Sequence, residues 1–475
     1  MLRTSLLLLL SSTLCHAQTF DTVIAGGRVI DPESGLDAVR FIGISQGKVR
    51  AVSQAPLTGR TTIQAHGLVV APGFIDLHWH GKDPATGRFQ VMDGVTSALE
   101  LEIGVAAIDD WYAAREGKSL VNHGASIGHA PVRMALMNDP GAFLPAGPAA
   151  HRAATDAEID EMKTRIEHGL RRGAPAVGFG IAYTKAASYW EILEMFRVAA
   201  KYKANAHVHI RGASSVAGVL ADREQGLSEV IAAATITGAP LHVVHINSSA
   251  QQSLDSMLQI ISEARLRGVD ITTEAYPYTA GATRIESALF DAWQDRLPSD
   301  YQTLQWMATG ERLNRESFLR YRKQGGTVIM HTNTEERVRT AILSPLTMIA
   351  SDGSDIRDGM GHPRSAGTFS RVLGRYVRDE GSLPLMDALR KMTLMPANRL
   401  AARVPSMRDK GRIRAGADAD LTIFDPARIR DRSTYEKAGI MSEGVVHVLV
   451  NGTAVVRDGK LIEGVYPGKA IRAPI

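Results

Sequence analysis

A long central stretch in which short apolar runs alternate with helix-periodic segments constrains the fold more than any other feature of this chain. The apolar runs that we interpret as strands are residues 68–77, 96–103, 176–181, 205–210, 241–246, 269–275, 327–330 and 346–350. Amphipathic helical periodicity is clearest in residues 156–172 and 188–202. Strands that alternate with helices form parallel sheets, and eight such units close a barrel. We therefore predict an α/β fold with a (β/α)₈ barrel of the TIM type.

Both ends of the chain have a different residue pattern from the middle. Alternating apolar residues punctuated by turn residues predict short antiparallel strands in residues 20–30, 38–52, 418–424, 445–450 and 454–462. Asn451-Gly452 and Asp458-Gly459 are typical of two-residue hairpin turns. We expect residues 18–70 and 405–475 to pair into one small β-sandwich domain beside a barrel formed by residues 71–404.

The first residues have the pattern of a secretory leader. Arg3 precedes the apolar run 6–10, and Cys15-His16-Ala17 resembles a small-residue cleavage site. The run is too short to span a bilayer. We expect a signal peptide over residues 1–17 and export to the periplasm or the medium, with lipid attachment at Cys15 as the alternative.

Cys15 is the single cysteine of the 475 residues. A mature chain that begins after Ala17 would therefore contain no disulfide, no thiolate ligand and no cysteine nucleophile. Any metal would have to be held by nitrogen and oxygen atoms.

The charge pattern does not indicate a nucleic-acid partner. The net charge is +4 at neutral pH, and Lys and Arg are interspersed with Asp and Glu. Such a mixture is typical of an ordinary solvated surface. We expect a small-molecule substrate, no nucleic acid and no membrane association after leader cleavage; a homo-oligomer is compatible with the sequence.

The segment PGFIDLHWH carries the strongest single motif. Because a strand has a period of two, His78 and His80 project from one face while Trp79 points to the other. Two imidazoles on one strand face could chelate a metal ion. The alternative is a pair of packed histidines with satisfied N–H groups.

Three later strand ends strengthen the metal hypothesis. His209 and His245 each end a predicted strand, and Asp352 follows another. Asp352 could be a metal ligand in one protonation state and a general base in another, or it could cap a helix. Barrel active sites lie at the carboxyl ends of the strands, where all these candidates fall.

Together these segments resemble the amidohydrolase superfamily, and most closely its D-aminoacylase (N-acyl-D-amino-acid deacylase) branch. The resemblance covers nearly the whole mature sequence. The segments that carry it are PGFIDLHWH, GVTSALELEIG, GHAPVR, HIRG, HVVHIN, EAYPYTAG, SDG, GHPRSAGTFSRVLG and the tail from ADADLTIFDP to VRDGKL.

The resemblance implies a ligand set for one or two Zn²⁺ ions. It places His78 and His80 on the first barrel strand, His209 on the fifth, His245 on the sixth and Asp352 on the eighth.

The resemblance also implies substrate contacts. Tyr276 or Tyr278, in the Tyr-Pro-Tyr stretch, is expected to polarise the amide carbonyl. Arg364 is expected to bind the substrate carboxylate through a two-pronged hydrogen bond. Tyr183 matches an active-site tyrosine after the fourth strand.

One departure from the branch concerns the ligand between two metals. A gapless overlay puts Ile103 where the D-aminoacylases have a cysteine ligand. Glu102 is nearest to the strand end and could bridge two metals, with Glu100 as the second choice and simple solvation or Arg pairing as the alternative. A carbamylated Lys185 is a further candidate for the bridge.

A second departure concerns the substrate. Asn247 stands where the branch usually has a lysine, so we expect an altered contact with the acid or the acyl group there. His129 and Arg133, in GHAPVR, match an element that we interpret as structural.

The preferred hypothesis is a zinc-dependent hydrolase in which metal-activated water cleaves an amide bond of an N-acyl amino acid or dipeptide-like substrate with a free carboxylate. The chirality of the substrate is left open. Asp352 would take the proton of the water and return it to the leaving nitrogen. Two alternatives remain: an amidohydrolase that acts on a cyclic amide, ester or lactone, and a non-catalytic exported barrel that binds a ligand.

Overall fold

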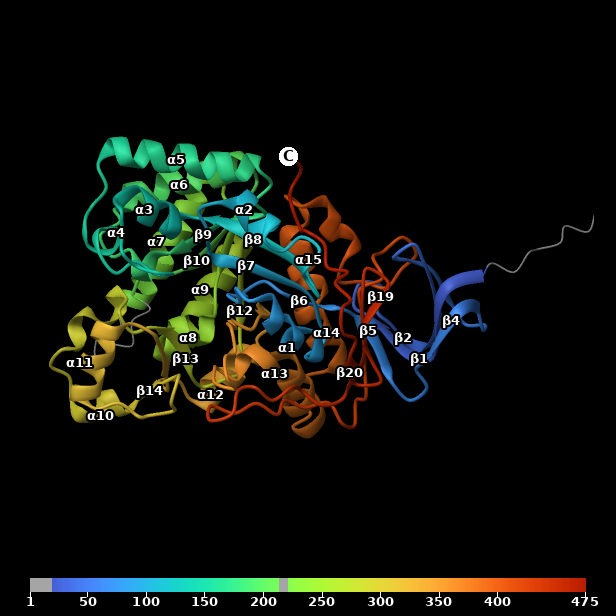
Figure 1. Cartoon of the computed structure of the whole chain (residues 1–475). Coiled ribbons are helices and arrows are strands. Elements are labelled where there is room, and N and C mark those ends of the chain that lie inside the picture. The colour runs from blue at the N-terminus through green and yellow to red at the C-terminus, as the bar shows by residue number, and fades with distance from the viewer. Residues whose placement is uncertain (1–18, 213–220) are drawn as a thin grey trace, which may run out of the picture.

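The computed structural model describes residues 19–212 and 221–475, so the predicted leader lies outside the described residues. Its centre is a sheet of eight parallel strands (Figure 1). In the order of the chain they are β6 (Phe74–Asp76), β7 (Val95–Val105), β8 (Asn122–Gly128), β9 (Ala176–Gly180), β10 (Asn205–His209), β11 (Leu241–Val243), β12 (Ile271–Ala275) and β16 (Thr347–Ile349).

The two edges of this sheet approach each other. A parallel bridge joins Trp79, after β6, to Gly353, after β16, and the His80 N–H donates to the Gly353 carbonyl at 2.7 Å. The sheet is therefore a nearly closed (β/α)₈ barrel, as the sequence predicts.

One strand prediction is wrong, and one barrel strand was not predicted. Residues 327–330 form a strand, but it belongs to a small antiparallel sheet outside the barrel. The barrel strand that the sequence analysis missed is β8, NHGASIG, in which every residue is buried. Ile127 is its single β-branched residue, and it has no Phe, Tyr or Trp, so the residues that usually reveal a strand are nearly absent. Its small residues are needed for close packing, because a Cβ on Gly124 would lie 2.9 Å from the carbonyl oxygen of Ile471.

Helices surround the barrel. They are α1 (Gly87–Met92), α2 (Ile108–Ala113), α3 (His129–Met137), α4 (Pro148–His151), α5 (Asp156–Arg171), α6 (Tyr189–Lys201), α7 (Ala221–Thr237), α8 (Ile246–Ala250), α9 (Leu254–Leu266), α12 (Glu335–Leu343), α13 (Arg364–Arg371), α14 (Leu385–Met392) and α15 (Leu394–Ala401). A capping box starts α5, because Thr155 and Glu158 each accept the other's backbone N–H, at 2.8 and 3.3 Å.

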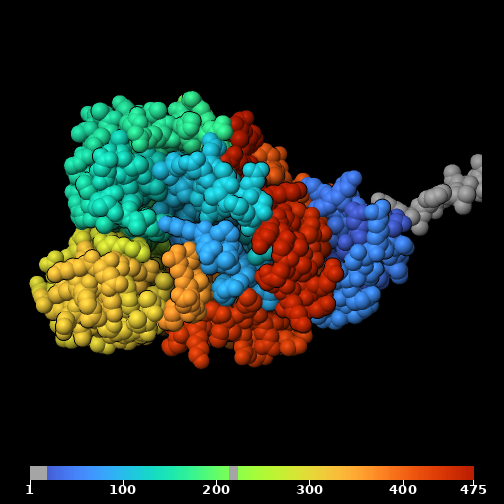
Figure 2. All heavy atoms as spheres, viewed as in Figure 1, coloured from blue at the N-terminus to red at the C-terminus, as the bar shows by residue number. Residues whose placement is uncertain are grey.

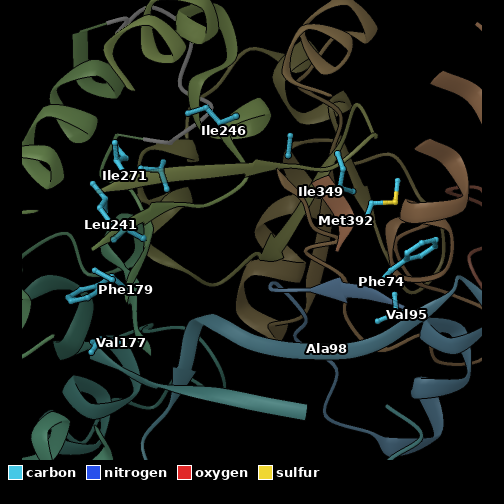
Figure 3. Packing of buried hydrophobic residues seen from close by; sticks show 14 of the residues in the cluster. Phe74, Val95, Ala98, Val177, Phe179, Leu241, Ile246, Ile271, Ile349 and Met392 are labelled. Carbon is cyan, nitrogen blue, oxygen red and sulfur yellow. The ribbon is translucent and has the colours of Figure 1, made fainter. Parts of the chain in front are cut away.

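Apolar side chains of the strands pack outward against the helices. Phe179 of β9 lies against Phe196 of α6, with ring centroids 5.0 Å apart. Figure 3 shows the same core on other strands, through Phe74, Leu241 and Ile349. The helices are therefore held to the barrel by a continuous apolar layer.

An insertion after β12 forms a lobe with its own core. Its strands β13 (Gly281–Arg284), β14 (Leu304–Trp306) and β15 (Thr327–Met330) pair antiparallel, and α10 (Pro298–Gln302) and α11 (Arg315–Gln324) belong to the same insertion. Buried aromatic residues of the lobe include Phe290, Trp293 and Phe318. The lobe, coloured yellow, bulges from one side of the molecule in Figure 2.

The two ends of the chain pair with each other, as predicted, and they form one nine-stranded sheet. Its strands are β1 (Thr19–Asp31), β2 (Leu36–Ser45), β3 (Lys48–Ser53), β4 (Thr58–Gln64), β5 (Val69–Pro72), β17 (Leu421–Phe424), β18 (Val445–Val450), β19 (Thr453–Arg457) and β20 (Lys460–Leu461). Antiparallel pairing of β5 with β17 joins the two ends. Asn451-Gly452 and Asp458-Gly459 are the hairpin turns, and all four residues have positive φ.

Parts of the C-terminal segment also contact the barrel. The Ile471 N–H donates to the His123 carbonyl of β8 at 2.7 Å. The Tyr435 hydroxyl accepts a hydrogen bond from the Ala280 N–H at 3.2 Å, next to the insertion. Within residues 19–212 and 221–475, no helix combines the length and the apolar character needed to cross a membrane.

Candidate metal centre

Two histidines stand side by side just after β6. The Nε2 atoms of His78 and His80 are 3.0 Å apart, because the period of the strand turns both rings to one face. Trp79 points the other way. A Cβ on Gly81 or Gly353 would lie 2.4 or 2.6 Å from its indole ring, so glycine at these positions allows Trp79 to pack beneath the pair.

Glu102 of β7 lies buried among four imidazole rings. Its Oε2 atom is 3.2 Å from Nε2 of His78 and 3.2 Å from Nε2 of His80. Its Oε1 atom is 2.7 Å from Nδ1 of His209 and 3.1 Å from Nε2 of His245. One carboxylate therefore faces two pairs of histidines, which is the position of a ligand that could bridge two cations.

An irregularity in β7 explains why Glu102 and not Ile103 occupies this position. The register of β7 against β8 shifts between Glu100 and Val105, and Gly104 has φ +71°. Glu100 lies behind His80 instead, with its Oε2 atom 2.6 Å from Nδ1 of that ring.

The remaining ligand candidates come from the ends of β10, β11 and β16. His209 ends β10, whereas His245 and Asp352 lie just beyond their strands in left-handed conformations, with φ +32° and +50°. Such backbone strain costs about 1–3 kcal/mol per residue and clusters at functional sites. The Oδ1 atom of Asp352 lies 3.5 Å from Nε2 of His78 and 3.4 Å from Nε2 of His80.

Arg364 keeps Asp352 ionised. Its Nη1 atom is 2.9 Å from Oδ2 of Asp352. Burial alone would raise the pKa of Asp352, but the charges of Arg364 and His78 outweigh it and hold that pKa far below its ordinary value. The cluster therefore contains two ionised carboxylates, Asp352 and Glu102, whose pKa is likewise well below the ordinary range because the surrounding imidazoles outweigh burial.

Nδ1 of His78 and Nδ1 of His80 point away from the centre of the cluster. Nδ1 of His78 lies 2.5 Å from Glu274, and Nδ1 of His80 lies 2.6 Å from Glu100. A carboxylate only accepts, so both Nδ1 atoms carry a hydrogen, and a cation that replaced any proton on Nε2 would meet an inward-facing lone pair on each ring. The sequence analysis did not single out Glu274; its place on β12 in the EAYPYTAG segment was the available signal.

This set of atoms fits a divalent metal. Inward lone pairs of imidazoles and ionised carboxylate oxygens are the ligands that Zn²⁺ uses in the absence of cysteine. The carboxylates outweigh burial and raise the pKa of His78 to about 10, which shows how strongly the cluster attracts positive charge. Two groups have all their ligand atoms within 4.8 Å of one another, namely His78, Glu102 and His245, and His78, His80 and Asp352.

A cavity of about 430 Å³ opens over the cluster, between the barrel mouth and the inserted lobe. Its apolar wall includes Phe143, Leu144, Leu289, Met307, Met330 and Met360. Its polar wall includes Arg364, Tyr276 and Tyr183. The cavity is thus a mostly apolar space with a few directed polar groups, as expected of a small-molecule site.

Arg364 and Tyr276 form one corner of this cavity. The guanidinium carbon lies 4.7 Å from the centre of the Tyr276 ring, and Arg364 is 3% exposed. Among the described residues, no atom accepts a hydrogen bond from its Nε. Burial raises the pKa of Tyr276 to about 12, so this phenol stays protonated and can donate.

Tyr183 occupies another part of the wall. Its hydroxyl accepts a hydrogen bond from Thr283 Oγ1 of the inserted lobe at 3.1 Å, and its ring lies 4.9 Å from that of His209. Burial raises the pKa of Tyr183, which keeps this phenol protonated as well.

Two predicted site residues, Tyr278 and Asn247, lie outside the lining of the cavity. Tyr278 donates a hydrogen bond to Asp431 at 3.3 Å and does not line the cavity. The side chain of Asn247 exchanges hydrogen bonds with the backbone of Tyr276, at 3.1 and 3.4 Å, and is fully buried. Asn247 therefore supports Tyr276, and only Tyr276 of the Tyr-Pro-Tyr stretch faces the cavity.

Lys185 is not part of the metal cluster. Its ammonium group forms an ion pair with Asp291 at 3.3 Å, and its side chain is 42% exposed. The carboxylate between the two histidine pairs is that of Glu102, and Lys185 contributes no atom to that cluster. His129 and Arg133 are fully buried and both contact Glu191, which agrees with their structural interpretation.

Comparisons with known proteins agree with this geometry. The model of the amidohydrolase family matches residues 123–456. The chain is 30% identical over 484 residues to an N-acyl-D-glutamate deacylase of Alcaligenes xylosoxydans xylosoxydans, covering 92% of this chain and 94% of the relative. It is 27% identical to a D-aminoacylase of the same organism, covering 96% and 98%.

A solved structure is similar over the same extent. It is that of an N-acyl-D-glutamate deacylase from Bordetella bronchiseptica, in complex with zinc and a phosphonate inhibitor that mimics the tetrahedral intermediate of the reaction. The TM-score is 0.81 at 27% identity, and the match covers 96% of this chain and 100% of the other.

Proposed function

The chain belongs to the amidohydrolase family, and from this premise we propose that it is a zinc-dependent hydrolase of N-acyl amino acids with a free carboxylate. The observation that carries the proposal is the buried guanidinium of Arg364 beside the metal cluster. The names of the relatives, an N-acyl-D-glutamate deacylase and a D-aminoacylase, support substrates of D configuration.

Arg364 supports a carboxylate-bearing substrate because its charge is only partly compensated. A buried cation is costly unless it is paired and hydrogen-bonded. The ion pair of Nη1 with Asp352 engages one side of the guanidinium, and Nε finds no hydrogen-bond acceptor among the described residues. The planar fork of an arginine matches a carboxylate in geometry and charge.

The residues of the cavity suggest a separate role in the reaction for each group. Zinc bound at the cluster would polarise the amide carbonyl and lower the pKa of water. Asp352, kept ionised by Arg364, would accept the proton of the attacking water and then donate it to the leaving nitrogen. The protonated Tyr276 would donate a hydrogen bond to the developing oxyanion. Arg364 would hold the substrate carboxylate and so orient the scissile bond.

The test is a substrate panel for the purified protein. N-acetyl-D-amino acids, their L enantiomers and the methyl esters of the D series would be compared by release of free amine, with and without a zinc chelator. We expect chelator-sensitive hydrolysis of the acids and a loss of about 30-fold or more in kcat/KM for the esters, as truncation of a buried charge pair costs about 2–5 kcal/mol. In Arg364→Met this preference for the acid should disappear.

Other outcomes would favour the alternatives. Equal turnover of acids and esters by the wild-type protein would contradict carboxylate recognition and favour hydrolysis of a cyclic amide, an ester or a lactone. Ligand binding without metal and without hydrolysis would favour the non-catalytic barrel.

We also propose that the protein is exported after cleavage behind Ala17, which the leader pattern in residues 3–17 supports. The amino-terminal sequence of the protein recovered from a fractionated host would test this. An intact Met1 in the cytoplasmic fraction would contradict export, and a lipid-modified Cys15 would favour the anchored alternative.

A further inference from the structure

The interior of the barrel beneath the metal cluster is unusually polar. Barrel interiors are normally filled by branched aliphatic side chains. Here Glu274 of β12 and His242 of β11 are 1% and 0% exposed. A buried carboxylate costs several kcal/mol unless its hydrogen bonds are complete. The partners of Glu274 therefore indicate what this residue does.

Glu274 connects a candidate metal ligand to the barrel interior. Its Oε1 atom lies 2.5 Å from Nδ1 of His78, and its Oε2 atom lies 3.0 Å from Nε2 of His242. Nδ1 of His242 lies 2.8 Å from the hydroxyl oxygen of Thr272. A single assignment satisfies all of these contacts: both rings donate to Glu274, and the Thr272 hydroxyl donates to His242. This assignment leaves the Nε2 lone pair of His78 directed at the cluster.

Glu100 does the same for the other histidine of the motif. Its Oε2 atom lies 2.6 Å from Nδ1 of His80, and its Oε1 atom accepts the Gly104 N–H at 3.2 Å. Glu100 is 6% exposed. Both histidines of the His78–His80 half therefore have a buried carboxylate behind them, which fixes the ring and makes the inward nitrogen a better donor to a cation.

The other half of the cluster has a different environment. Nδ1 of His245 lies 3.0 Å from the hydroxyl oxygen of Ser249, a neutral group. His209 turns Nδ1 itself toward Glu102, at 2.7 Å. Among the described residues, no carboxylate other than Glu102 contacts either of these rings. The two halves thus share Glu102 but differ by two negative charges behind the ligands.

We propose that Glu274 and Glu100 are positioning residues that set the zinc affinity of the half formed by His78, His80 and Asp352, and leave the half formed by His209 and His245 nearly unaffected. The inference rests on the zinc-dependent function proposed above. Residues that orient metal-binding histidines typically change metal affinity by about 10–100-fold when they are replaced.

The test uses Glu274→Gln and Glu100→Gln in the whole protein. Glutamine keeps the size of the side chain and one acceptor oxygen but removes the charge. The matched control is Glu191→Gln, because Glu191 is also fully buried and also contacts an imidazole, 2.7 Å from Nε2 of His129, in a cluster without candidate ligands. The metal-free melting temperature of each variant separates loss of stability from loss of zinc.

Zinc binding would be measured by competition between the metal-free protein and a chromophoric chelator. Zinc anomalous scattering from crystals equilibrated at limiting free zinc would then report the occupancy of each half. We expect each of the two variants to weaken one zinc-binding step by about 10–100-fold and to lose occupancy at His78 and His80. Glu191→Gln should bind zinc as the wild type does.

Wild-type zinc affinity in both variants, or equal weakening of both halves, would overturn the inference. A deficit no larger than that of Glu191→Gln would do the same. If one variant fails to fold, the other decides the question, because Glu274 and Glu100 lie behind different rings. A wild-type protein that binds zinc but cleaves no N-acyl amino acid would refute only the proposed substrate, whereas one that binds no zinc would refute both proposals.

Discussion

Two buried clusters in this molecule combine histidine with carboxylate, and they differ in how their atoms are satisfied. In the first, which joins α3 to α6, the Glu191 carboxylate accepts hydrogen bonds from His129 at 2.7 Å and from Arg133 at 2.6 and 2.7 Å. Arg133 also donates to the Ala149 carbonyl at 2.8 Å. One anion meets one cation, and every short contact joins a donor to an acceptor.

The metal cluster has the same residue types with the opposite balance. Nε2 of His78 and Nε2 of His80 are 3.0 Å apart, and Glu102 and Asp352 add ionised oxygens to the same space. Ionised carboxylates and imidazole nitrogens share one space there, and the raised pKa of His78 shows that this space favours positive charge. The balance of donors and acceptors, and not the residue types, therefore separates a structural cluster from a site that binds a ligand.

The largest expected effect is on catalysis at Asp352. Asp352→Asn removes the proton acceptor but keeps the size of the side chain, so we expect kcat to fall by about 10³-fold, within the range of general acid–base catalysis. The zinc content, measured by elemental analysis, should stay close to that of the wild type. A variant with full activity would show that Asp352 is not the base.

The next effect concerns the carboxylate shared by both histidine pairs. Glu102→Gln removes the charge that faces all four rings, so we expect zinc to be lost from both halves. The loss of affinity should exceed the roughly 10–100-fold typical of residues that lie behind metal ligands. Retention of both ions by a folded Glu102→Gln protein would show that the two clusters are more alike than their contacts indicate.

The smallest effect on function is expected in the first cluster. Arg133→Met leaves Glu191 buried without its cation, which typically costs about 3–5 kcal/mol of folding free energy. The free energy of unfolding in denaturant should fall accordingly, while zinc content and KM stay unchanged below the transition. Selective zinc loss from a folded Arg133→Met protein would contradict a purely structural role for this cluster.

Much of the fold followed from local patterns. The hairpin turns at Asn451-Gly452 and Asp458-Gly459 and the helix after Thr155 have strong local signals, and the structure contains all of them. Strand β8 has no such signal, since its glycines and polar residues are selected by close packing. Residues 327–330 have a clear strand signal, but no local pattern tells a barrel strand from a strand of an insertion.

The candidate site, like the fold, could be predicted where local patterns decide and could not be predicted where distant contacts decide. The period of two that pairs His78 with His80 is local, and the ends of strands pointed to His209, His245 and Asp352. By contrast, Tyr276 and Tyr278 are two residues apart in one motif, yet only Tyr276 lines the cavity while Tyr278 bonds to Asp431.

The sequence by itself determined which strand ends carry imidazoles and carboxylates, because strand periodicity acts over a few residues. Only the tertiary structure decided which carboxylate stands between the rings and which stand behind them. The irregular register of β7 selects Glu102. The contact of Glu274 with His78 joins residues 196 positions apart. Residues that are distant in the sequence decide whether a buried polar atom has a hydrogen-bond partner in the protein or is left to bind a ligand. No local sequence pattern identifies those residues.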